Sequence, residues 1–122
     1  MTEQEILYYN KLIAKFMGDY KGLYWSDINE FYLNENGQMA MLTNRCGRWN
    51  SSWDWIMDVV IKINTMEDFR YSTKILTMDV EIEDSHTLKI VAESSLDFNP
   101  DELLKSVYQC VVKFIEWYNK NN

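Results

Sequence analysis

The sequence predicts a single α+β domain over residues 1–122, with the element order α-β-β-α-β-β-α. We expect one four-stranded antiparallel sheet with the helices packed on one of its faces. Three observations lead to this fold class. Apolar residues recur at helical spacing in three segments, two other segments alternate apolar and polar residues as hairpins do, and Trp49, Trp53 and Trp55 crowd into the middle of the chain. We expect these three indoles to form interior scaffolding.

The first expected helix begins at a capping box and ends at a glycine. Thr2 can accept a hydrogen bond from the backbone N–H of Glu5, whose carboxylate can reach back to the N–H of Thr2. Apolar residues then recur at helical spacing as far as Gly18, a residue typical of helix C-termini. Residues 19–29 are unusually aromatic, and we expect them to form a loop.

A first hairpin is expected to follow this loop. The pair Asn36-Gly37 is typical of a two-residue type I′ turn, which fixes how the flanking strands pair. Apolar residues then meet on one face, because this turn sets Phe31 opposite Leu42 and Leu33 opposite Ala40.

The second expected helix starts at Ser51 or Ser52. Ser51 and Asp54 fit a capping pattern, in which the side chains at the helix start bond to free backbone N–H groups. Apolar residues cover most of the circumference and leave a narrow polar stripe, so we expect this helix to be covered nearly all round. Within that stripe, Asp58 and Lys62 are spaced to form an ion pair.

The second hairpin has the clearest strand pattern, with alternation over residues 75–83 and again over 88–93. A two-residue turn would set an apolar residue against a polar one. A three-residue loop over 84–86 is therefore preferred. It pairs Ile82 with Leu88, Val80 with Ile90 and Glu81 with Lys89.

The third expected helix has Asn99 as its cap and Pro100 as its first helical residue. Two parallel apolar stripes follow: Leu103, Val107, Cys110, Phe114 and Trp117, and beside them Leu104, Tyr108, Val111, Ile115 and Tyr118. Together these stripes are wider than contact with one sheet requires. We therefore expect a second covering surface, which is either another helix or the partner chain of a homodimer.

Composition excludes several classes of function. The net charge of −7 argues against direct nucleic-acid binding, which needs clustered Lys and Arg, and against an anionic membrane surface. No apolar run approaches membrane-spanning length, and the first residues lack the basic region of a signal peptide, so we expect a cytoplasmic protein. Cys46 and Cys110 should then be free thiols.

No catalytic or metal-binding set can be assembled from the sequence. His86 is the only histidine, it falls on a hairpin tip, and the two cysteines lie in separate elements. Nucleophilic catalysis needs a base held beside a serine or cysteine, and no such pair is evident. We therefore expect no cofactor, no metal and no enzymatic activity.

Our first functional interpretation is a non-enzymatic intracellular interaction protein that acts by protein–protein contact. Two surfaces could carry that contact. An acidic group on the second hairpin comprises Asp79, Glu81, Glu83, Asp84 and Glu93, and it could mimic a nucleic-acid backbone in a basic groove. An aromatic patch comprises Tyr20, Tyr24 and Trp25, residue types that dominate binding hot spots, although these rings could equally cover the core.

The alternative interpretation is a protein that binds a small nucleotide-like anion at the start of the second helix. Five residues define that site: Arg45, Arg48, Trp49, Ser51 and Ser52. The arginines would pair with a phosphate or carboxylate, the indole would stack, and the free N–H groups of the helix would donate hydrogen bonds. Asp54 in the first turn opposes this interpretation by like-charge repulsion.

Two blocks of the chain resemble a group of small uncharacterised proteins that are common in bacteriophages and in mobile elements of Bacteroidota. Residues 51–63 read SSWDWIMDVVIKI, and residues 107–119 read VYQCVVKFIEWYN. The resemblance implies no defined activity. It favours a phage or mobile-element accessory role, including inhibition of a host defence system.

Overall fold

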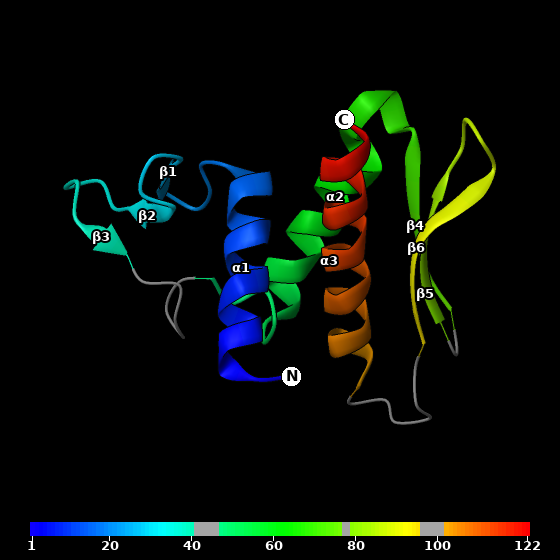
Figure 1. Ribbon diagram of the computed structural model, residues 1–122, viewed down its shortest axis with the longest axis horizontal. Coiled ribbons are helices and arrows are strands. Elements are labelled where there is room, and N and C mark those ends of the chain that lie inside the picture. Colours follow the sequence, from blue (N-terminus) through cyan, green and yellow to red (C-terminus); the bar gives the residue numbers. More distant parts are fainter. Residues whose placement is uncertain (41–46, 77–78, 96–101) are drawn as a thin grey trace.

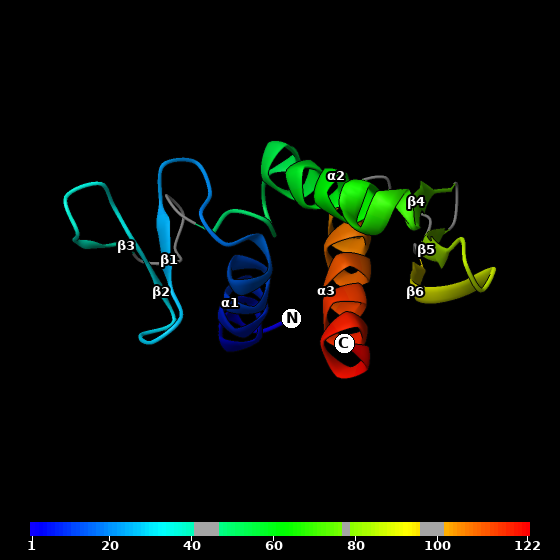
Figure 2. The ribbon, with the colours of Figure 1, turned by 90° about the horizontal axis from the view of Figure 1, so that it is seen from above.

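The computed structural model describes residues 1–40, 47–76, 79–95 and 102–122. Within this part of the chain the elements are α1 (Glu3–Met17), β1 (Tyr24–Ser26), β2 (Phe31–Leu33), β3 (Met39–Ala40), α2 (Trp53–Phe69), β4 (Tyr71–Ile75), β5 (Asp79–Asp84), β6 (Lys89–Ser95) and α3 (Leu103–Asn121). The predicted α+β class is confirmed. The helices lie between an N-terminal sheet, β1-β2-β3, and a C-terminal sheet, β4-β5-β6 (Figures 1 and 2).

The single four-stranded sheet was a wrong prediction, because the two hairpins never meet. Each hairpin instead gains a third strand and forms its own antiparallel sheet. Figure 2 shows α1 beside the N-terminal sheet and α3 beside the C-terminal sheet, with α2 crossing above α3 toward β4. The helices thus form a central layer, which we call the helical layer. The N-terminal sheet packs one face against one side of this layer, and the C-terminal sheet packs one face against the other side.

Helix α1 begins and ends as its sequence predicts. The Thr2 hydroxyl accepts a hydrogen bond from the N–H of Glu5 at 3.1 Å, and the Glu5 carboxylate accepts from the N–H of Thr2 at 3.2 Å. At the other end, Gly18 adopts a positive φ of 67° and its N–H donates to the carbonyl of Ala14. The capping box is confirmed, and it holds the first turn that lies next to α3.

The N-terminal sheet differs from the expected hairpin in one strand and in its register. Strand β1 comes from the segment predicted as a loop, and it pairs with β2. Between β2 and β3, Leu33 lies opposite Met39, where Ala40 was expected. The expected partner of Phe31, Leu42, falls outside the described residues.

The register shift follows from the chemistry of the turn. The Asn34 side chain accepts hydrogen bonds from the N–H groups of both Asn36 and Gln38, each at 2.9 Å. The N–H of Asn34 donates to the carbonyl of Gln38, and Gly37 takes a positive φ of 76°. These bonds close a three-residue turn with a glycine at its left-handed position, and such a turn shifts strand pairing by one residue relative to type I′.

Helix α2 starts after Ser52, but the expected side-chain cap does not form. The expectation that this helix is covered nearly all round was wrong, because Trp53 is 41% exposed and Ile61 is 56% exposed. The buried residues lie on one side: Trp55, Ile56, Val59, Val60 and Ile63. The expected pair of Asp58 with Lys62 is also wrong. Asp58 lies 3.7 Å from the ammonium of Lys21, and the Lys62 ammonium donates to the carbonyl of Phe16.

The C-terminal sheet is a three-stranded meander. The alternating run predicted over 75–83 is divided between β4, which ends at Ile75, and β5, which begins at Asp79, and the N–H of Leu76 donates to the carbonyl of Asp79. Between β5 and β6, Ile82 lies opposite Ala92 and Glu81 opposite Glu93, so the expected register was wrong. The cause is a bulge between Ile82 and Glu83 together with a longer loop over 85–88.

Helix α3 is the central packing element. It packs against β5, β6, α1 and α2, and both apolar stripes contribute to its buried side: Val107, Tyr108, Cys110, Val111, Val112, Phe114 and Ile115. The broad apolar surface predicted for this helix is confirmed, and the other helices provide its second cover. Its expected cap at Asn99 and Pro100 lies outside the described residues.

Candidate interaction surfaces

The outer face of the C-terminal sheet is acidic. Strand β5 alternates, so that Val80 and Ile82 are fully buried against the helical layer while Asp79, Glu81 and Glu83 lie on the opposite side. Strand β6 adds Glu93, which is exposed and lies directly opposite Glu81. We call Asp79, Glu81, Glu83 and Glu93 the acidic face. No described helix or strand covers it (Figures 1 and 2).

Only part of this charge is neutralised within the sheet. Lys74 of β4 is opposite Glu81 in the register, but its ammonium bonds to the Glu83 carboxylate at 2.7 Å. The hydrogen bond that Lys74 donates to Glu83, followed by the attraction of the Glu83 charge, raises the pKa of Lys74. Glu81 and Glu93 therefore remain as a like-charged cross-strand pair, which is an unfavourable arrangement in a sheet.

Asp84 does not belong to the acidic face, contrary to our expectation. It is 1% exposed, and Arg70 binds it with two hydrogen bonds of 2.9 and 2.8 Å. The N–H of His86 donates to the same carboxylate at 2.9 Å. The guanidinium of Arg70 is the main cause that lowers the pKa of Asp84 to about 2. This buried ion pair ties the end of α2 to the C-terminal sheet.

The structure does not bring the three residues of the expected aromatic patch together on one surface. The Tyr20 ring lies 5.8 Å from that of Trp49 and 5.1 Å from that of Trp55, and its hydroxyl donates to Asp58. Trp25 packs edge-on against Tyr32 at 5.3 Å. Only Tyr24 lies on the outer side, with 52% of its surface exposed. Tyr20 and Trp25 therefore cover the core.

The expected anion site at the start of α2 is only partly in view. Arg45 lies outside the described residues, whereas Arg48 and Ser51 are exposed and Ser52 is half-buried. Trp49, expected to stack on a ligand, is fully buried among the rings of Tyr20, Tyr32 and Trp55. Its ring is already covered on the sides that a ligand would need.

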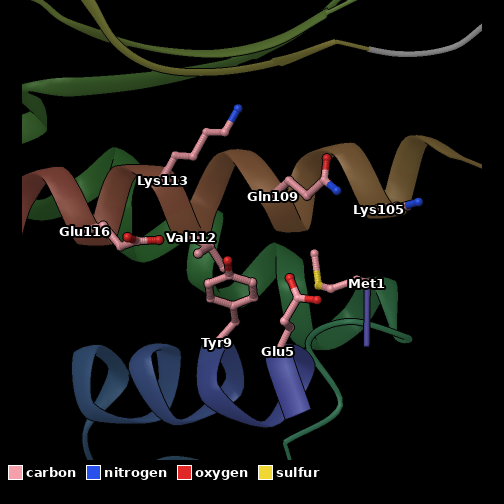
Figure 3. A pocket seen from close by; sticks show the side chains of 8 residues that line it. All are labelled: Met1, Glu5, Tyr9, Lys105, Gln109, Val112, Lys113 and Glu116. Carbon is pink, nitrogen blue, oxygen red and sulfur yellow. The ribbon is translucent and has the colours of Figure 1, made fainter. Parts of the chain in front are cut away.

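A groove of about 480 Å³ runs between α1 and α3, and the sequence did not predict it. Figure 3 shows Glu5 and Tyr9 pointing from α1 toward α3, while Gln109 and Lys113 point toward the C-terminal sheet. There Gln109 accepts a hydrogen bond from Ser94, and Lys113 donates to the carbonyl of Glu93. Because these two side chains bond to the sheet, the groove is chiefly a packing interface between α1 and α3.

The described residues contain no group of three or more His, Cys, Asp or Glu side chains that could hold a metal ion. Cys110 is buried, and burial raises the pKa of its thiol to about 12, which keeps it protonated and unreactive at neutral pH. Among the helices that the structure describes, none is long and apolar enough to cross a membrane.

A scan against protein-family models, a search of curated proteins and a search of solved structures each found no match for this chain.

Proposed function

We propose that the protein acts inside the cell as a non-enzymatic interaction protein, and that its acidic face binds a basic surface on a protein partner. The observation that carries the proposal is the pair of Glu81 and Glu93 on an uncovered sheet face. Like charges directly opposite each other destabilise a sheet, and a cationic partner would remove that cost on binding. The stability that the folded protein loses through this repulsion would therefore be regained when the partner binds.

The chemistry of the partner follows from the charge balance of this face. The acidic face presents four carboxylates, and among the residues that the structure describes only Lys74 is bonded to them, through Glu83. A row of carboxylates on a flat sheet can occupy a groove that normally accepts phosphates. The resemblance to phage and mobile-element proteins extends the proposal to a role as an accessory protein that inhibits a host defence system.

The variant Glu93→Lys tests the proposal because it should not harm the fold. A lysine there would face Glu81 and replace repulsion with attraction, so lost binding could not be attributed to unfolding. Wild type, Glu93→Lys and the matched charge reversal Glu3→Lys, on exposed α1, would serve as baits in lysate of a Bacteroidota host. Quantitative mass spectrometry would compare what each bait captures.

We expect at least one protein to bind wild type and Glu3→Lys equally well. Glu93→Lys should capture about tenfold less of it or even less, because the loss of one charge pair costs roughly 1.4 kcal/mol of binding free energy. Added salt or an excess of duplex DNA should displace that protein, because both compete for its basic surface. Equal capture by all three baits, or capture that neither salt nor DNA weakens, would refute the proposal.

A further inference from the structure

No helix or strand in the described part of the chain covers the outer face of the N-terminal sheet, and this face differs in kind from the acidic face. The register aligns Trp25, Tyr32 and Ala40 in one cross-strand row, and Tyr32 in this row is fully buried against the helices. The neighbouring row must point to the opposite side of the sheet, because successive side chains alternate along a strand. That side faces away from α1 in both views (Figures 1 and 2).

The residues on this outward side are almost all apolar. Tyr24, Leu33 and Met39 form one row, and Phe31 lies two residues before Leu33 on the same side. Tyr24 is 52% exposed, Met39 is 55% exposed, and Phe31 and Leu33 are half-buried. We call these four residues the apolar face. An antiparallel sheet with one solvated side normally carries polar residues there, so apolar residues on both sides are typical of a sheet that is covered twice.

The charge around the apolar face indicates what covers it. The segment 22–40 contains three acidic residues, Asp27, Glu30 and Glu35, and no Lys or Arg. Asp27 and Glu30 lie in the turn between β1 and β2, and Glu35 lies in the turn between β2 and β3. The sheet therefore has an exposed carboxylate at each end of its apolar side.

We propose that the apolar face is a docking surface for an amphipathic, basic segment of a partner protein. Apolar side chains of the segment would cover Tyr24, Phe31, Leu33 and Met39, and its Lys or Arg residues would meet the carboxylates in the turns. A second copy of this chain fits worse. It would bring three acids against three acids, in molecules that each carry a net charge of −7.

A short helical peptide of Leu and Lys is a suitable probe, titrated into ¹⁵N-labelled protein while amide chemical shifts are recorded. A Leu/Glu peptide of the same pattern tests the need for positive charge, and a Ser/Lys peptide tests the need for apolar contact. Of the three peptides, we expect the Leu/Lys peptide alone to bind the N-terminal sheet well, with its largest shifts in β1, β2 and β3. Shifts centred on β5 and β6 would mean that the peptide binds the acidic face, and they would overturn the proposal.

Variants then locate the contact. The double variant Tyr24→Ser with Met39→Ser removes two half-exposed side chains, so its circular dichroism spectrum should match wild type. We expect its affinity for the Leu/Lys peptide to fall about tenfold or more. Tyr8→Ser, which truncates a 59% exposed tyrosine on α1, and Glu93→Lys on the acidic face should bind nearly as wild type does.

Two other results would contradict the docking surface. Binding that the double variant leaves unchanged would show that the apolar face is not the contact. A dimer in sedimentation experiments that the double variant abolishes would show that the face is covered by a second copy of the chain, and the charge argument would then be wrong.

Discussion

The two sheets bury their inner faces with different chemistry. The N-terminal sheet has strands of three, three and two residues, and its buried side is a cluster of rings in which Trp25 packs against Tyr32 and Tyr32 packs against Trp49. The C-terminal sheet has strands of five, six and seven residues, and its buried side is aliphatic at its centre, with Val80 and Ile82, and has one buried ring, Tyr71, at the start of β4. Few backbone hydrogen bonds hold the first sheet together, so its position depends on aromatic packing.

Their outer faces differ as well, and at opposite ends of the molecule (Figure 2). The acidic face offers long-range attraction to a cationic partner, which is screened by salt. The apolar face offers contact that salt does not weaken, and only its turns are charged. Binding at the apolar face should therefore depend less on ionic strength than binding at the acidic face, and changes on either sheet should reveal which chemistry each surface uses.

The largest expected effect concerns the ring cluster of the N-terminal sheet. Trp49→Ala should lower the free energy of unfolding by about 4 kcal/mol, because it leaves a cavity where a fully buried indole contacts Tyr20, Tyr32 and Trp55. Urea unfolding measures the loss. Trp53→Ala is the matched control, since that indole is 41% exposed, and a loss as large as that of Trp49→Ala would contradict the model of the cluster.

The next effect concerns the ion pair that anchors the C-terminal sheet. Asp84→Ala removes a buried carboxylate that accepts three hydrogen bonds, two from Arg70 and one from the N–H of His86. We expect a loss of about 2 kcal/mol in the free energy of unfolding, typical of hydrogen bonds to a charged group. Glu83→Ala, next to it but partly exposed, should cost clearly less.

The ion pair of Asp84 with Arg70 can also be tested by measuring the free energy of unfolding at acidic pH. Folding lowers the pKa of Asp84 from 3.8 to about 2, so the folded protein holds this proton less tightly than the unfolded chain does. The pair therefore contributes its full stabilisation above about pH 4, and the contribution is lost as the pH falls toward 2. Asp84→Ala should show a shallower loss of stability over that range, and parallel curves for wild type and variant would contradict the assignment.

The elements were predictable where the pattern is local, and the pairings were not. The inward side chains Val80 and Ile82 follow from alternation alone, as the capping box at Thr2 does from four residues of sequence. Both registers failed because each depends on a few hydrogen bonds in a turn or on a bulge, as with the Asn34 side chain. The two separate sheets depend on contacts between distant segments, which periodicity does not encode.

The candidate site residues also divide into those that a local sequence pattern places correctly and those that it does not. Glu81 and Glu93 were correctly placed on the outer face by alternation. Alternation also puts Asp84 on the inner side with Ile82, but its partner Arg70 lies fourteen positions earlier, and no local pattern joins the two. The sequence does not predict the apolar face, because it predicts a loop over residues 19–29, and Tyr24 then has no strand partner that fixes its direction.

A smaller effect separates the inner and outer tyrosines of the N-terminal segment. Tyr20→Phe removes the hydroxyl that donates to Asp58, and it should lower the free energy of unfolding by about 1 kcal/mol, whereas Tyr24→Phe should have almost no effect. Burial, and then the bond to Asp58, raise the pKa of Tyr20 above its ordinary value of 10. Wild type should therefore lose stability as the pH rises above 10, and Tyr20→Phe should lose less. Equal urea midpoints for the two variants would contradict a stabilising hydrogen bond from the Tyr20 hydroxyl to Asp58.

The smallest expected effect has the opposite sign. Glu93→Gln keeps the shape of the side chain but removes its charge, so it should relieve the repulsion from Glu81 and raise the free energy of unfolding by about 0.5 kcal/mol. The gain should shrink in high salt, because exposed charges are screened there. The matched change Glu3→Gln removes an exposed acid from the first turn of α1, where it favours the helix, and it should slightly lower stability. A stabilised Glu93→Gln that also binds its partner less well would show that the acidic face is kept for contact at a cost to the fold, whereas a destabilised variant would show that Glu93 serves the sheet itself.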